Sequence, residues 1–348
     1  MLLRAPRPVE EAPLAAADLP VPDPAPDEVR LRVRACGVCH TDLHTVEGEL
    51  AAPRLPLVPG HQVIGVVDAV GRDVPPGGPR VGDTAGVPWL HRSCGACAFC
   101  ARGDENLCLD PRFTGLHVPG GYAEHLCAPA AFVCALPPAR APDGGAAGAA
   151  ADADAAALAP LLCAGIIGYR ALRRAGVAPG ETLALWGFGA SAHLALQIAR
   201  HWGCTVHVFT RGAAHRALAL RLGAAWAGAA EDPPPAPAHR AVSFAPAGRL
   251  VPLALAGLER GGTLALAGIH LDAVPALDYQ RHLFQEKTLT SVTAATRADA
   301  AALFALAAAV PLRTDVQRFP LAEANAALAA LKHGRLAAAA AVLEVAAA

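Results

Sequence analysis

A cluster of four cysteines is the feature that most restricts how this chain of 348 residues can fold. Ten cysteines are unevenly spread along the chain, and four of them fall within fifteen positions: Cys94, Cys97, Cys100 and Cys108. Four thiolates at this spacing satisfy the tetrahedral coordination of a structural zinc ion. An iron–sulfur cluster also takes four cysteines, but no proline follows the last one as in the bacterial ferredoxin pattern. We therefore predict a zinc ion that holds this loop together and performs no chemistry itself.

The rest of the composition describes a globular protein without affinity for nucleic acid or membranes. Hydrophobic residues make up 54% of the chain, charged residues 17%, and the formal net charge is -1, so no basic surface is expected. The N-terminus lacks the apolar segment of a signal peptide, and no apolar run is long enough to span a bilayer. Cysteines in such a chain bind metal or act in catalysis more often than they form disulfides. We predict a soluble, cytoplasmic protein.

Two parts of the chain differ in composition and hydrophobic pattern, which predicts two domains of different architecture. Residues 1–155 are rich in proline and glycine, and short apolar runs such as Val29–Val33 and Val63–Val70 predict strands of a mostly-β domain. In residues 156–294, short apolar runs alternate with helical stretches, which predicts an α/β domain with a parallel sheet. The expected strands are Leu183–Trp186, Val206–Phe209, Ala241–Phe244, Thr263–Ala267 and Thr288–Val292, and the expected helices include His193–Trp202 and Ala213–Leu222.

Two further segments complete this division. Residues 295–348 contain two helical patterns around Pro311–Pro320 and no sheet of their own, so we expect them to pack on the first domain. The Ala139–Ala157 segment is rich in alanine, glycine and aspartate. Its composition fits a flexible surface insertion and the start of a helix equally well.

Three separate segments offer ligands for a second metal ion. The segment CGVCHTDLH contains Cys39, PGHQVIG supplies His61, and LLCAG supplies Cys163. Taken singly, Cys163 is typical of a small core residue and His61 of a structural histidine. Together they form the Cys₂His set of a catalytic zinc, which leaves a fourth position for water or substrate. Such a zinc lowers the pKa of a bound alcohol, so that an alkoxide forms near neutral pH.

The order of these motifs resembles the zinc-dependent alcohol dehydrogenases of the medium-chain dehydrogenase/reductase superfamily. The resemblance rests on the zinc motifs, the four-cysteine loop, the segment GGYAEH at 120–125 and a later dinucleotide-binding pattern, and it covers essentially the whole chain. It implies a GroES-like, mostly-β catalytic domain formed by residues 1–155 and 295–348, which carries both zinc sites. It also implies a doubly wound Rossmann domain formed by residues 156–294.

The same resemblance assigns roles to individual residues. Cys39, His61 and Cys163 would hold the catalytic zinc, and the four clustered cysteines would hold the structural zinc. Thr41 and His44 would relay the proton that leaves the alcohol. Trp89, just before the cysteine cluster, would form a wall of the pocket for a small alcohol. The alternatives are an exposed loop position for His44 and a core position for Trp89.

One position departs from the family pattern. The family usually carries Gly-His-Glu, whereas this chain reads Gly60-His61-Gln62. A neutral Gln62 beside the zinc leaves the site more positive by one charge than a glutamate would. We expect zinc binding to persist, with altered electrostatics and ligand exchange.

A strand, a glycine turn and a helix follow one another in residues 182–200, TLALWGFGASAHLALQIAR. Gly187 allows the tight turn, and Gly189 lets the backbone approach a pyrophosphate at the helix N-terminus. Ala192 takes the place of the third glycine, which the pattern tolerates. The segment therefore predicts a dinucleotide site.

The end of the second strand of this domain favours NADP over NAD. An acidic residue roughly 20 positions after the turn would bind the ribose 2′-hydroxyl of NAD, but Thr210 and Arg211 lie there instead. A hydroxyl and a guanidinium suit a 2′-phosphate, which a carboxylate would repel. Arg216 either assists them or is a solvated helix residue.

These patterns predict an enzyme with two zinc ions per chain. It would transfer a hydride between NAD(P) and a small alcohol, aldehyde or ketone through a zinc-bound alkoxide, and the resemblance implies a homodimer or homotetramer. The alternative hypothesis is a zinc-stapled nucleotide-binding protein that has lost catalysis and acts as a sensor or structural partner. Gln62 motivates this alternative, because a fold does not guarantee a function.

Overall fold

The computed structural model describes residues 1–136 and 154–345, which fold into two compact units. Unit 1 comprises Met1–Cys163 and Ala294–Ala348, and unit 2 comprises Ala164–Thr293. Unit 2 thus begins at Ala164, a few residues after the change of composition near residue 155. Of the alanine-rich stretch 139–157, residues 139–153 lie outside the described residues, and its end forms helix α3 (Ala155–Leu158).

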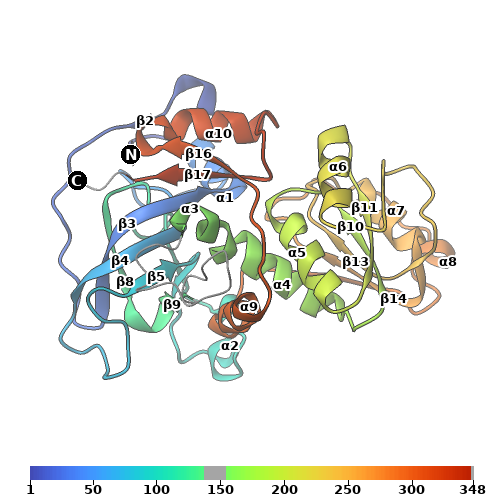
Figure 1. Ribbon diagram of the computed structural model, residues 1–348, viewed down its shortest axis with the longest axis horizontal. Coiled ribbons are helices and arrows are strands. Elements are labelled where there is room, and N and C mark those ends of the chain that lie inside the picture. The colour runs from blue at the N-terminus through green and yellow to red at the C-terminus, as the bar shows by residue number, and fades with distance from the viewer. Residues whose placement is uncertain (137–153, 346–348) are drawn as a thin grey trace. The chain divides into compact units, whose positions relative to one another are not determined.

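Unit 1 is built on a seven-stranded sheet in the order β16-β17-β3-β4-β5-β9, with β8 paired to β3 (Figure 1). Its longest strand, β3 (Glu28–Val38), buries Val29, Leu31 and Val33 in alternation, as a strand with one face on the core does. It pairs antiparallel with β4 (Gln62–Val70). This pairing places the residues that follow β3 beside those that precede β4.

Short elements complete the first part of unit 1. Its other strands are β1 (Leu2–Leu3), β2 (Leu14–Ala15), β5 (Thr84–Val87), β6 (Leu90–Arg92), β7 (Arg112–Phe113), β8 (His125–Pro129) and β9 (Cys134–Ala135). Its helices are α1 (His40–Glu47), α2 (Ala98–Ala101) and α3, with the short 3₁₀ helices η1 (Val9–Glu11), η2 (Glu105–Leu107), η3 (Ala130–Phe132) and η5 (Ala159–Leu162).

The C-terminal segment packs on unit 1 and also extends its sheet. It forms α9 (Arg297–Ala309), β16 (Val316–Pro320), η6 (Leu321–Glu323), α10 (Ala324–Lys332) and β17 (Ala340–Glu344). The two helices agree with the sequence patterns, whereas the strands were not expected. β17 pairs antiparallel with β3 (Figure 1), and its alanines carry little strand preference of their own. Burial against the neighbouring strand, and not local propensity, decides its conformation.

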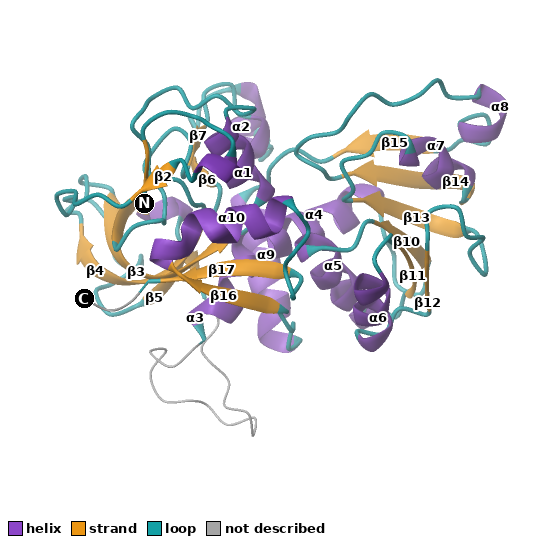
Figure 2. Cartoon of the chain, turned by 90° about the horizontal axis from the view of Figure 1, so that it is seen from above, coloured by secondary structure: helices purple, strands orange, loops and turns teal. Residues whose placement is uncertain are grey.

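Unit 2 contains a six-stranded parallel sheet in the order β12-β11-β10-β13-β14-β15, seen strand beside strand in Figure 2. Its strands are β10 (Thr182–Trp186), β11 (Thr205–Phe209), β12 (Trp226–Gly228), β13 (Ala238–Ser243), β14 (Leu258–Leu266) and β15 (Thr288–Ser291). Its helices are α4 (Ala164–Ala175), α5 (Ala190–His201), α6 (Ala213–Arg221), α7 (Leu250–Ala256) and α8 (Tyr279–His282). Helices α4 and α5 cover one face and α7 the other (Figure 1). This is the doubly wound order of the Rossmann fold, which confirms the predicted fold class.

The strand order reverses between β10 and β13. The chain leaves β10 toward β11 on one side, while β13 and β14 build the sheet on the other side. Ligands of such sheets bind outside the carboxyl ends of the strands at this switch point. The glycine turn at 187–189 follows β10 directly and therefore lies at this point.

One helical stretch, Ala155–Ala175, is long and apolar enough to cross a membrane by length and composition alone. However, 67% of its apolar window is buried inside the protein. That is typical of a core helix, whose apolar side chains pack against other elements of the same fold.

Candidate functional site

The structure brings Cys39, His61 and Cys163 together, although they are far apart in the sequence. One possible ligand atom of each, sulfur or ring nitrogen, lies within 4.8 Å of the others. His61 is fully buried, and the two cysteines are half-buried. All three belong to unit 1.

Strand pairing and packing explain this convergence. Gly37 of β3 faces Gln62 of β4. Cys39, directly after β3, and His61, directly before β4, therefore lie at neighbouring strand ends. Cys163 follows η5, which packs on β4 and β5. The packing is tight, because a Cβ atom on Gly86 of β5 would lie 2.6 Å from Leu162 Cδ2.

Asp42 organises the polar groups around this cluster and was not predicted as a site residue. Its Oδ1 accepts hydrogen bonds from His61 Nδ1 at 2.8 Å and from the Gly60 N–H at 3.2 Å, while its Oδ2 accepts from the Cys39 N–H at 3.0 Å. Asp42 is only 2% exposed, so the three donors compensate a buried charge. The sequence signal was its place three residues after Cys39, where it forms a capping box at the start of α1.

The donor set fits a zinc ion. Among the described residues, His61 Nε2 is buried and has no hydrogen-bond partner, as expected of a metal ligand whose other nitrogen is held by a carboxylate. The hydrogen bond from Cys163 lowers the pKa of Cys39 well below its usual range, and the same contact raises the pKa of Cys163. Burial alone would lower the pKa of His61, but the charge of Asp42 and its hydrogen bond raise it to about 10. The cluster thus stabilises a thiolate, the form that binds zinc.

The proposed relay residues lie on α1, which begins directly after Cys39. Thr41 is buried, and its Oγ1 lies 3.7 Å from Cys39 Sγ. His44 lies farther along the helix, and its Nδ1 forms a short contact with the carboxylate of Glu49. Glu49 was not predicted, because a loop glutamate carries no sequence signal for this contact.

Trp89 and Gln62 both lie beside His61. The Trp89 and His61 rings are in edge contact, with centroids 4.8 Å apart. The Phe113 ring stacks on the Trp89 ring, and their centroids are also 4.8 Å apart. Gln62 is buried, and a Cβ atom on Gly37 would lie 2.5 Å from its Oε1. The amide is therefore packed closely against β3.

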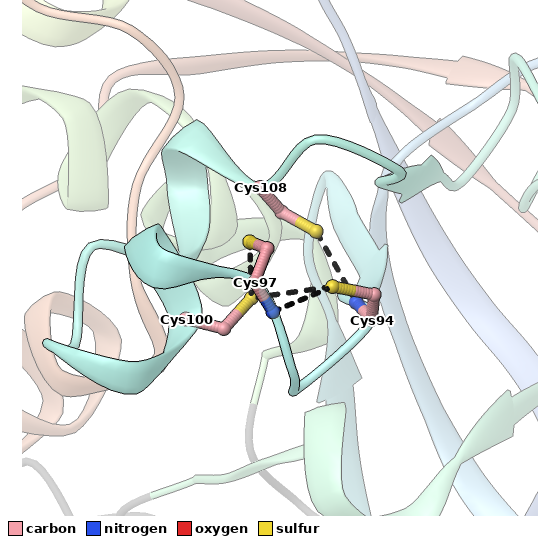
Figure 3. Close-up of side chains that lie close together, drawn as sticks. All are labelled: Cys94, Cys97, Cys100 and Cys108. Atoms are coloured by element: carbon pink, nitrogen blue, oxygen red, sulfur yellow. Dashed lines mark hydrogen bonds between the residues drawn. The ribbon is translucent and has the colours of Figure 1, made fainter.

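The four clustered cysteines form a separate group in unit 1, with their side chains turned toward one another (Figure 3). Cys97 Sγ lies 3.6 Å from Cys100 Sγ. Backbone N–H groups point at the sulfurs: Cys97 N donates to Cys94 Sγ at 3.3 Å, and Cys94 N donates to Cys108 Sγ at 3.2 Å. Hydrogen bonds from the backbone of Cys100 and Leu109 lower the pKa of Cys97 to about 6. The loop is thus arranged for thiolates that share one metal ion.

An ion pair fastens this loop to the C-terminal segment of unit 1. The guanidinium of Arg297, at the start of α9, donates to both carboxylate oxygens of Glu105, with the shortest distance 2.7 Å. The Arg297 guanidinium carbon also lies 4.4 Å from the ring centroid of Phe132. Glu105 is buried, so the bidentate pair satisfies a charge that would otherwise be uncompensated.

In unit 2, the glycine turn has the geometry of a nucleotide cradle. Gly187 has φ +84°, a conformation that favours glycine, and a Cβ atom there would lie 3.0 Å from the backbone nitrogen of Ala245. Gly189 caps the N-terminus of α5, and a Cβ atom there would meet no protein atom within 4 Å. Packing within the protein therefore does not require Gly189, and the space beside it is open. Ala192 is fully buried in α5.

Thr210 and Arg211 lie between β11 and α6. Thr210 is nearly buried, and Arg211 is exposed. Arg216 Nη1 donates to the carbonyl oxygens of both residues at 2.9 Å. Arg216 therefore shapes this turn, and Arg211 presents the exposed cationic side chain.

Comparisons with known proteins agree with this architecture. Residues 25–138 match the alcohol dehydrogenase GroES-like domain. The chain is 48% identical to a probable alcohol dehydrogenase, AdhA, of Mycobacterium tuberculosis, over 98% of this chain and 96% of that protein. It is similar to a solved cinnamyl alcohol dehydrogenase of Sorghum bicolor, with 27% identity, a TM-score of 0.85 and coverage of 99% and 97%. It is also similar to a cobalt- and zinc-bound thermostable alcohol dehydrogenase of Pyrobaculum aerophilum, with 26% identity, a TM-score of 0.84 and coverage of 99% and 98%. Zinc-ligand geometry, fold and relatives agree, and the chain belongs to the zinc-dependent alcohol dehydrogenases of the medium-chain dehydrogenase/reductase superfamily.

Proposed function

We propose that this chain transfers a hydride between NAD(P) and a small alcohol, aldehyde or ketone. The observation that carries the proposal is the convergence of Cys39, His61 and Cys163, with the Trp89 ring against the histidine ligand. Zinc bound by these three residues would supply a Lewis acid that makes a substrate hydroxyl more acidic.

The chain's own residues would hold the ligands and move the proton. Asp42 accepts from His61 Nδ1, which leaves Nε2 free for the metal. Thr41 lies beside Cys39, and His44 lies in contact with Glu49, whose side chain is 58% exposed. We propose a proton path from Thr41 through His44 to Glu49 and solvent.

We propose NADP as the preferred cofactor and two zinc ions per chain. The exposed guanidinium of Arg211 and the hydroxyl of Thr210 support the first proposal, because both suit a 2′-phosphate. The four-cysteine cluster supports the second, because it is distinct from the Cys39–His61–Cys163 set.

Replacing Arg211 by alanine is expected to raise KM for NADP by about 10-fold or more, since hydrogen bonds to charged groups contribute about 1.5–3 kcal/mol. KM for NAD should change little, because NAD lacks the 2′-phosphate. Steady-state kinetics with both cofactors measure the difference. Arg221→Ala is the matched control, because it removes the same charge from an exposed position at the far end of α6. An equal loss for both cofactors would contradict the assignment.

We also propose a cytoplasmic location and an assembly of two copies of the chain. All ten cysteines are free in the structure, which supports a reducing, cytoplasmic environment. Strand β15 is one of the two edges of its sheet, and it carries the exposed Leu289, with the exposed Phe284 shortly before it in the chain. Because exposed apolar edge strands tend to pair, we propose a homodimer formed along β15, which analytical ultracentrifugation would test.

The competing function is a zinc-stapled nucleotide-binding protein without catalysis, which Gln62 favours. Zinc-loaded protein assayed with primary and secondary alcohols and with aldehydes, using NADP(H) and NAD(H), separates the two functions. We expect turnover with at least one substrate class. Tight cofactor binding without turnover across the whole panel would favour the sensor or structural role.

A further inference from the structure

The Gly120–Tyr122 segment, part of the GGYAEH motif, lies directly against the backbone that leads to His61. Three consecutive N–H groups donate to that backbone: Gly120 to Val58 O at 2.7 Å, Gly121 to Gly60 O at 3.0 Å, and Tyr122 to Pro59 O at 2.9 Å. A Cβ atom on Gly120 would lie 2.0 Å from Gly60 O. The two segments therefore approach as closely as their backbones permit.

The side chain of Tyr122 continues this contact. The residue is fully buried, and its ring covers Gly60 so closely that a Cβ atom there would lie 2.4 Å from Tyr122 Cδ1. Gly60 also has φ +99°, which favours glycine. Ring and glycine together fix the conformation of the residue directly before the histidine ligand.

The hydroxyl of Tyr122 is a buried polar group that packing alone does not explain. Among the described residues no fully formed hydrogen bond satisfies it, but the Asp42 carboxylate lies within its reach. Burial raises the pKa of Tyr122 well above its usual value, and the charge of Asp42 and the hydrogen-bond contact with it raise it further. The phenol is therefore kept as an O–H donor, in the electrostatic field of the carboxylate that holds His61.

The polar surroundings of Asp42 indicate what that donor does. The buried Asp42 carboxylate accepts from His61, Gly60 and Cys39, and two carboxylate oxygens can accept about four hydrogen bonds. A phenylalanine would fill the same space without bringing an unpaired hydroxyl into the core, and buried hydroxyls without partners are rare.

We propose that Tyr122 is a positioning residue for His61. Its ring fixes the Gly60 turn, and its hydroxyl donates to Asp42, which holds the carboxylate against His61 Nδ1. The inference rests on the proposed zinc function and deepens it, because it assigns the GGYAEH motif a role in metal retention.

Zinc release from the full-length, zinc-loaded protein tests this proposal. The metal is captured with a coloured chelator, and the phase of release that Cys163→Ser eliminates is assigned to the Cys39–His61–Cys163 site. Tyr122→Phe is expected to release zinc from that site about 10-fold faster or more, the size of effect seen when a group that orients a metal ligand is lost. The melting temperature and the zinc of the four-cysteine cluster should not change.

Tyr169→Phe is the matched control, because Tyr169 is also buried but lies in unit 2, where its hydroxyl accepts from Arg173. Unchanged release in Tyr122→Phe, or equal release in both variants, would overturn the inference and leave the proposed function intact. Wild-type protein that retains no zinc at the Cys39–His61–Cys163 site would overturn both. Tyr122→Phe keeps the ring and removes only the hydroxyl, so we expect this variant to fold.

Discussion

Replacing Cys163 by serine is expected to lower kcat/KM for the best alcohol substrate by at least about 1,000-fold, which corresponds to about 4 kcal/mol of transition-state stabilisation. A serine oxygen is a poor zinc ligand at neutral pH, so the site would keep only Cys39 and His61. The protein should still fold, because the substitution changes one half-buried atom. Steady-state kinetics, zinc content and thermal unfolding measure the three consequences separately.

Cys204→Ser is the matched control for this variant. Cys204 is buried in unit 2, where its thiol donates to Ala178 O at 3.4 Å, and a serine hydroxyl can make the same bond. This control should keep its activity and its zinc. Full activity of Cys163→Ser with only one zinc per chain would show that the predicted metal site does not perform the reaction.

Replacing Cys97 by serine is expected to act on stability first. Loss of one thiolate leaves Cys94, Cys100 and Cys108 to hold the structural zinc, and binding energy at such a site is folding energy. We expect loss of this zinc and a melting temperature lower by at least about 5 °C. Proteolysis should begin within residues 93–110, because the metal fixes a loop with little other secondary structure.

Cys127→Ser tests whether any cysteine loss has this effect. Cys127 lies on β8 with its thiol near Pro22 O, outside both cysteine groups. Its replacement should leave zinc content and melting temperature close to those of the wild type. An equal fall in the melting temperature of both variants would contradict a structural zinc at the four-cysteine cluster. Unchanged resistance of residues 93–110 to proteolysis in zinc-free Cys97→Ser would also contradict it.

The motifs that could be read from the sequence are those whose geometry is local. The four-cysteine loop and the turn containing Gly187 and Gly189 each act within a short segment, where spacing and permitted φ values restrict the conformation. Alternation of apolar runs with helical stretches likewise predicted the parallel sheet of unit 2. The structure agrees with the predicted fold class, and the cysteine loop lies as its spacing indicated.

Other site residues carry no such local signal. Cys163 was assigned only in combination with Cys39 and His61, as a Cys₂His set that the family resemblance supports, because a lone cysteine in an apolar run indicates only a core residue. The contacts of Asp42 and Tyr122 with the His61 segment could be recognised only in the structure, where β3, β4 and the 120–122 segment lie side by side. Strand β17 was missed because its alanines have little intrinsic preference for a strand.

From the residues alone we could predict the ligand types, the two domain architectures and the glycine turn after β10, because periodicity and residue chemistry are properties of short segments. Which distant groups meet follows only from the folded chain: Asp42 contacts His61, and Tyr122 contacts Gly60. Such meetings depend on strand pairing and on the burial of whole side chains. These contacts join segments far apart in the chain, so no window along the sequence contains the partners together.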